Sequence, residues 1–248
     1  MVQALLRASG AIRLNALLGN DFITPLLRGH AMKTITGIEW KSFERFNEED
    51  RCNIVATNVV GKSVLDLGCG EGHILNYVRE KNKDAECLGI DGCAEYVSNA
   101  KKNYPKIQFK NKKIQNLGGI RADTVLLLEV IEHSENPVDL IKIAKKHAKK
   151  RVIISVPYLD RMNFCLYDKI DTKYSPHYQI YDVTRLRHQL RAAGLTSFII
   201  RSSGFHSPIL KNKIVSAVLG RIMLLLNLRP RFPYPTENCK TLIAVADV

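Results

Sequence analysis

Two acidic residues and a histidine stand close together after an apolar run in the segment VLLLEVIEHSENP, residues 125–137. The pattern Glu129-x-x-Glu132-His133 leaves three interpretations open. Glu132 and His133 could cap a following helix or pair with nearby lysines. His133 could instead act as a general base toward a hydroxyl group, with Glu132 as a second catalytic residue. Alternatively, Glu129, Glu132 and His133 could bind Mg²⁺ or Mn²⁺, with zinc as a further candidate.

A second group of residues with chemical potential is the glycine-rich segment VLDLGCGEGHIL. Gly68, Gly70 and Gly72 alternate where an apolar run gives way to a helical pattern, so the backbone can turn tightly and approach a ligand closely. The N–H groups at the start of a helix can then bind a carboxylate or phosphate. Asp91 ends the next apolar run, LGID, where a carboxylate can accept hydrogen bonds from ribose hydroxyls. This combination predicts a site for a nucleoside cofactor.

The elements that would position these residues alternate between strand and helix from residue 62 onward. Short apolar runs with amphipathic stretches between them predict a mostly parallel sheet that is covered on both faces. We therefore expect a doubly wound α/β domain at 61–248, with a seven-stranded Rossmann-like sheet, after an N-terminal helical arm at 1–60. The predicted strands are 62–68, 86–91, 106–110, 123–130, 151–157, 196–202 and 240–248, and the predicted helices are 71–82, 94–103, 137–150, 183–194 and 209–228.

Three of these segments, VLDLGCGEG, GID and LLEVIEH, resemble the class I S-adenosylmethionine-dependent methyltransferases, and most closely their quinone-biosynthesis O-methyltransferases. The resemblance runs from about Lys62 to Val248, and KTLIAVADV matches the extra strand that is typical of the fold. It implies S-adenosylmethionine as cofactor, with Gly68, Gly70 and Asp91 along its methionine and ribose parts. It also implies a contact between Asp66 and the amino end of the cofactor, and it places Glu129 among the cofactor-binding residues.

The sequence departs from the family pattern at one position. Relatives usually carry an acid after the third strand that bonds the adenine amine, whereas the corresponding residue here is Lys113. We therefore expect adenine to be recognised differently, through the backbone of Ile114 or the side chain of Gln115.

A downstream histidine bears on the metal interpretation. Small-RNA 2′-O-methyltransferases combine an E-x-x-E-H pattern with one later histidine as a metal site, and His177 in PHYQIYDVTRL stands at the position expected for that fourth ligand. The resemblance thus extends the predicted metal ligands to Glu129, Glu132, His133 and His177.

The acceptor of the methyl group is the least constrained property. We expect O-methylation of a small acceptor, hydrophobic or lipid-like, because the segment 209–228 is apolar and the N-terminal arm could enclose a pocket. RNA is the alternative acceptor, because 37 basic residues against 24 acidic ones give a formal charge of +13. A non-catalytic scaffold with the same fold is a third hypothesis. No DNA partner is predicted.

Composition restricts the cellular setting. The six cysteines form no C-x-x-C pair, which favours a reducing compartment, and no apolar run is long enough to span a membrane. We expect a cytoplasmic protein in which the 209–228 segment could contact a membrane peripherally. Residues 1–30 are rich in arginine and poor in acids, as in a mitochondrial targeting segment. The alternative location is therefore the mitochondrial matrix or the inner-membrane face.

Overall fold

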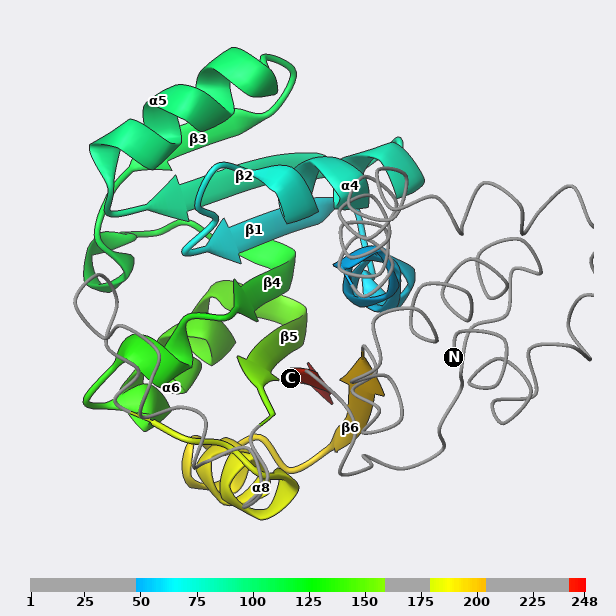
Figure 1. Ribbon diagram of the computed structural model, residues 1–248, viewed down its shortest axis with the longest axis vertical. Helices are drawn as coiled ribbons and strands as arrows, with labels where there is room; N and C mark the ends of the chain where they lie inside the picture. The colour runs from blue at the N-terminus through cyan, green and yellow to red at the C-terminus, as the bar shows by residue number, and fades with distance from the viewer. Residues whose placement is uncertain (1–47, 159–178, 204–240) are drawn as a thin grey trace, which may run out of the picture. The chain divides into compact units, whose positions relative to one another are not determined.

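The computed structural model describes residues 48–158, 179–203 and 241–248 (Figure 1). They build a seven-stranded sheet in the order β3-β2-β1-β4-β5-β7-β6. Strands β1 to β5 run parallel to one another, and β7 pairs antiparallel with both β5 and β6. This topology confirms the predicted fold class. The strands are β1 (Ser63–Leu67), β2 (Glu86–Asp91), β3 (Gln108–Asn111), β4 (Ala122–Leu128), β5 (Ala148–Pro157), β6 (Phe198–Ser203) and β7 (Thr241–Asp247).

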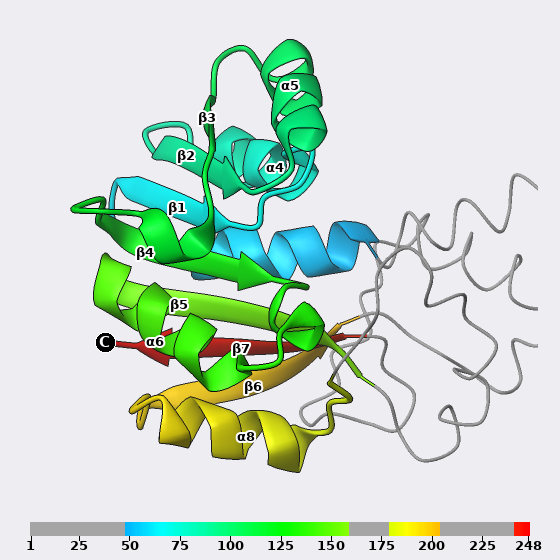
Figure 2. The ribbon, with the colours of Figure 1, turned by 90° about the vertical axis from the view of Figure 1, so that its left-hand side faces the viewer.

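Helices cover both faces of the sheet (Figure 2). The helix at 48–58, α4 (His73–Lys81) and α5 (Ala94–Asn103) pack on one face, and α6 (Pro137–His147) and α8 (Val183–Ala192) pack on the other. Alternation along a strand produces this arrangement, because successive side chains point to opposite faces. In β4, Val125 and Leu127 belong to the core on the α6 side, whereas Leu126 and Leu128 belong to the core on the α4 side.

The structure explains two of the boundaries that differ from the prediction. The predicted helix at 137–150 ends at His147, because Ala148 pairs with Ala122 and opens β5, so strand pairing overrides the helical pattern of the lysines. The predicted strand at 123–130 ends at Leu128, because Glu129 has a φ of 53° and leaves the extended conformation. The predicted helix 209–228, His177 and residues 1–47 of the arm lie outside the described residues, so the division into an arm and a domain stays a prediction.

The connection from β3 to β4 contains one short 3-10 turn, η3 (Ile114–Asn116), in place of a full helix. As a result, no described helix covers one face of β3. Phe109 is buried on the α5 side, but Gln108 and Lys110 are exposed on the other side, beside the half-buried Leu88 of β2.

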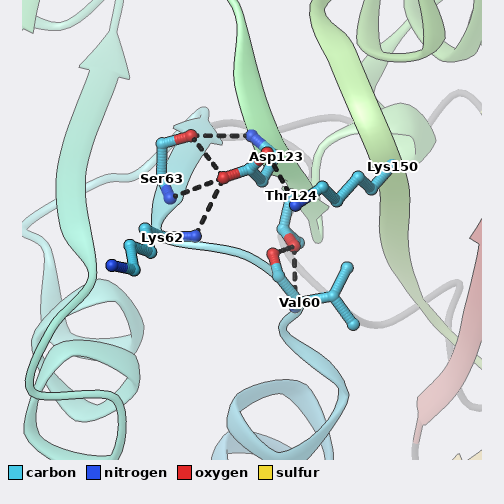
Figure 3. Close-up of polar contacts among 6 residues, drawn as sticks. All are labelled: Val60, Lys62, Ser63, Asp123, Thr124 and Lys150. Carbon is cyan, nitrogen blue, oxygen red and sulfur yellow. Dashed lines mark hydrogen bonds and ion pairs between the residues drawn. The ribbon is translucent and has the colours of Figure 1, made fainter.

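A network of hydrogen bonds fixes the amino ends of β1 and β4 (Figure 3). The Asp123 carboxylate accepts hydrogen bonds from the backbone N–H groups of Lys62 and Ser63 at 2.8 and 3.2 Å. The Thr124 hydroxyl donates to the Val60 carbonyl at 2.7 Å and accepts from the Val60 N–H at 2.9 Å. These contacts connect the 48–58 helix to the centre of the sheet.

No helix in the described part of the chain is long and apolar enough to cross a membrane.

Candidate functional site

The glycine loop follows β1 at the carboxyl edge of the sheet. Gly68 and Gly72 have φ values of 81° and 83°, which side chains rarely tolerate. The N–H groups of Gly68 and Cys69 donate to the carbonyl of Ile90 at 2.8 and 3.1 Å, which holds the loop against β2. A Cβ atom on Gly68 would lie 2.5 Å from a methyl group of Val130. Both the backbone conformation of the loop and the close contact with Val130 therefore require glycine at position 68.

Asp91 lies at the end of β2, opposite this loop. Its two carboxylate oxygens accept hydrogen bonds from the N–H groups of Gly70 and Cys93, each at 2.8 Å. A carboxylate offers about four acceptor positions, so two remain for other donors. Asp91 therefore supports the Gly70 turn and has acceptor positions left, and its contact with ribose hydroxyls stays a prediction.

Asp66 is almost completely enclosed in β1, with 3% of its surface exposed. One of its carboxylate oxygens has no hydrogen-bond partner in the described structure. Burial raises the pKa of Asp66 to about 7, and the negative charge of Asp91 adds to the effect. An enclosed acid with an unsatisfied oxygen fits a cationic partner, so this residue and the open glycine turn suit a cofactor with an ammonium group and a ribose.

The predicted adenine region follows β3. Lys113 is exposed immediately before η3, Ile114 is half-buried and packs against the α6-side core, and Gln115 is exposed. Adenine recognition by Ile114 or Gln115 remains a prediction.

Glu129 adopts a left-handed backbone immediately after β4, with a φ of 53°. Its N–H donates to the Ser155 carbonyl at 3.0 Å, and the Ser155 hydroxyl donates to its carboxylate at 2.7 Å. The Arg51 guanidinium, from the 48–58 helix, lies 3.8 Å from the same carboxylate oxygen. Burial raises the pKa of Glu129, although Arg51 and Ser155 partly offset this effect. Two elements far apart in the sequence thus fix this carboxyl group at the strand end.

Glu132 and His133 belong to the 3-10 turn η4 (Ile131–His133). The Glu132 side chain is 1% exposed. One of its oxygens has no hydrogen-bond partner among the described residues, and the other lies 3.9 Å from Nε2 of His133. Burial raises the pKa of Glu132 to about 8, and the charge of Glu129 contributes. The site therefore holds an acid that exchanges its proton near neutral pH.

The geometry bears on the metal interpretation. Glu129 precedes the η4 turn, so it does not share a helical face with Glu132 and His133. Within 48–158, 179–203 and 241–248, no three His, Cys, Asp or Glu side chains are arranged to hold a metal ion. Because His177 lies outside these ranges, the four-residue metal site stays a prediction.

Sequence reasoning missed Arg51 and Ser155. Arg51 belongs to a helix in which no motif distinguishes it, and only the fold brings it to Glu129. Ser155 did carry a signal, because it is a hydroxyl residue in the apolar run RVIISVP near the carboxyl end of a strand.

Comparison with known proteins matches residues 41–198 to a family model described as a methyltransferase domain. The chain belongs to this family of methyltransferases. The match includes β1 to β5 and the 48–58 helix, and therefore every described residue assigned to the site.

Curated relatives support the same family. A putative methyltransferase 235L of Invertebrate iridescent virus 6 is 44% identical over 22% of this chain and 21% of the viral protein. An (S)-tetrahydroprotoberberine N-methyltransferase of Eschscholzia californica is 32% identical over 31% of this chain and 23% of the plant protein. A tRNA U34 carboxymethyltransferase of Campylobacter jejuni is 26% identical over 64% of this chain and 57% of the bacterial protein. The chain therefore covers from about a fifth to somewhat more than half of these relatives.

Solved structures share the fold. The plantazolicin methyltransferase BpumL, in complex with a triazolic desmethylPZN analog and SAH, superimposes with a TM-score of 0.57 at 18% identity, covering 91% of this chain and 93% of that one. The chain carries a methyltransferase domain, and its fold is the Rossmann-like fold of these structures. The comparisons do not single out the quinone-biosynthesis type.

Proposed function

We propose that this methyltransferase transfers a methyl group to an oxygen atom of a small, lipid-like acceptor. The observation that supports the proposal most strongly is Glu132, which is enclosed, has one oxygen without a partner in the described part of the chain and has its pKa raised to about 8. A hydroxyl acceptor must lose its proton as the new bond forms, and a base whose pKa lies near the working pH does this best.

S-adenosylmethionine, held by Asp66, the glycine loop and Asp91, would supply an electrophilic methyl group on a sulfonium. Glu132, with His133 beside it, would take the proton from the acceptor hydroxyl as the methyl group is transferred to that oxygen. Arg51 and Ser155 hold Glu129 at the end of β4, next to the glycine loop. The main contribution of the protein is to hold the two reactants close together in the productive orientation.

RNA is the second candidate acceptor. It is supported by the formal charge of +13 and by the similarity to a tRNA U34 carboxymethyltransferase at 26% identity. Cytoplasmic location, and membrane contact near a lipid-like acceptor, remain parts of the proposal.

The experiment that tests the proposal is methyl transfer from radiolabelled S-adenosylmethionine into a cell extract, with the purified protein and with its Asp91→Ala variant. The products are separated into RNA, protein, aqueous and organic fractions, with and without EDTA. The organic fraction is then extracted with acid, because a methyl ether stays in the organic phase whereas a methylated amine becomes charged and leaves it.

Label that stays in the organic phase, and that depends on Asp91, is the expected result. If EDTA abolishes that label, the metal ion predicted from the E-x-x-E-H pattern takes part in the reaction. Label in the acid extract would show that the acceptor atom is nitrogen and not oxygen. Label in RNA would show that RNA, and not a small lipid-like molecule, is the acceptor.

A further inference from the structure

A hollow of about 560 Å³ lies at the edge of the sheet opposite the glycine loop. The first residues of four strands line it, among them Ser63 of β1, Glu86 of β2, Gln108 of β3 and Ala122 of β4. Ligands of parallel α/β sheets bind at the carboxyl ends of strands, so this hollow at the amino ends is separate from the cofactor site.

The missing helix between β3 and β4 explains why the hollow exists. A helix in that connection would cover the face of β2 and β3 on the α6 side. Instead, the chain passes from β3 through η3 to Arg121, and leaves Leu88 and Ile120 half-buried at the hollow. The hollow therefore combines an apolar surface with polar walls, and its volume lies within the usual range of small-molecule sites.

The walls of the hollow carry more positive than negative charge. Four cations, Arg79, Lys83, Lys106 and Arg121, line it together with two carboxylates, Asp84 and Glu86, so their formal charges sum to +2. Among the described residues, none of these six side chains forms an ion pair with another.

Arg121 is already fixed for binding. Its guanidinium donates a hydrogen bond to the Ala148 carbonyl at 3.1 Å, which anchors the side chain where β4 and β5 begin. A guanidinium has five N–H donors in one plane, so most of them remain available for a phosphate.

We infer that this hollow is a second binding site, for a ligand of mononucleotide size that carries a terminal phosphate. The phosphate lies among Arg121, Lys106 and their basic neighbours, while the organic body covers Leu88 and Ile120. Asp84 and Glu86 can accept hydrogen bonds from sugar hydroxyls, and their charge disfavours a continuous track of phosphates such as an RNA backbone.

Calorimetric titration with adenosine 5′-monophosphate tests this inference. The protein is first saturated with S-adenosylhomocysteine, so that the nucleotide cannot bind the cofactor site. We expect binding of the monophosphate and no detectable binding of adenosine, because adenosine lacks the phosphate.

Substitutions locate the bound nucleotide. We expect Lys106→Gln and Arg121→Gln each to weaken it by about tenfold, the loss of one charge-assisted hydrogen bond. Lys106 has no hydrogen bond or ion pair to another described residue, so its variant tests the charge even if Arg121→Gln disturbs folding. The matched control is Lys101→Gln on α5, an exposed lysine outside the hollow, which should leave affinity unchanged.

Absence of binding, or equal affinity in all three variants, would contradict the inference. The last experiment is a competition between the monophosphate and a single-stranded RNA of about twelve nucleotides. If the RNA displaces the monophosphate, binds more tightly and loses affinity steeply with salt, the hollow belongs to an RNA surface and the mononucleotide inference fails.

Discussion

Asp66 illustrates how a buried residue can report on the cofactor. Its carboxyl group is enclosed, one oxygen lacks a partner among the residues that the structure describes, and burial raises its pKa to about 7. The charged form is therefore costly in the free protein, and an ammonium group at this position would stabilise it.

We predict that S-adenosylmethionine affinity falls as the pH decreases from about 7 to about 5, by up to tenfold per pH unit, because protonation of Asp66 then competes with ammonium binding. Titration calorimetry of the wild type and of Asp66→Asn measures this effect. The variant should bind more weakly and show a flatter pH dependence, and a flat dependence in the wild type would contradict the assigned role. Asp91→Ala should abolish cofactor binding throughout this range.

Glu132 gives a second pH-dependent prediction, for turnover. A general base works in its deprotonated form, so kcat should rise as the pH increases through about 8, the pKa to which burial raises Glu132. Glu132→Gln should lower kcat by about 10² or more while cofactor affinity stays unchanged. We expect the same combination, a lower kcat with unchanged cofactor affinity, for His133→Ala. Undiminished turnover in that variant would exclude both the base and the metal interpretations of His133.

Ser155 is expected to act through Glu129, because its hydroxyl donates to that carboxylate at 2.7 Å. We predict that Ser155→Ala lowers kcat by about tenfold, the value of one hydrogen bond to a charged group. A double-mutant cycle with Glu129→Gln provides the control. If the two effects simply add, Ser155 does not act by positioning Glu129.

At the scale of elements, hydrophobic periodicity was enough to place the strands, because buried parallel strands form short apolar runs that a single sequence displays. The prediction of α5 at 94–103 was confirmed to the residue, since Pro105 and the polar Asn103 end its pattern. The left-handed turn at Glu129 could not be predicted, because its support comes from Ser155 and Arg51 on other elements. The glycine loop is local in sequence, whereas the environment of the acids is built by tertiary contacts.

The network at the amino ends of β1 and β4 gives a prediction about stability. Hydrogen bonds from the Lys62 backbone, with further contributions from Lys150 and Ser63, lower the pKa of Asp123 to about 2. This contribution is present above about pH 4 and is lost as the pH falls toward 2. Asp123→Asn should therefore lower Tm at neutral pH, and the difference from wild type should shrink in acid. Calorimetry at both pH values measures it, and a pH-independent difference would show that the charge is not responsible.

At the scale of the whole molecule, the formal charge of +13 separates the two acceptor classes. Binding of RNA releases counterions and weakens by about 10³ or more when salt rises from about 50 to about 200 mM, if six or more phosphates are contacted. For a small uncharged acceptor, we predict that kcat/KM changes by less than about twofold over this range. Steady-state assays at several KCl concentrations measure the slope, and a steep one would favour RNA.

The order β5-β7-β6 has a consequence for synthesis of the chain. In the described sheet, β6 pairs with β7 alone, and β7 follows β6 in the sequence. While the ribosome is still making the segment after residue 203, β5 has one open edge and β6, with Ile199 half exposed, has no neighbouring strand. Unpaired strands of this kind are where nascent chains aggregate. Translation through residues 241–247 thus closes the sheet, and a ribosome that stops before them releases a chain with two unprotected strands.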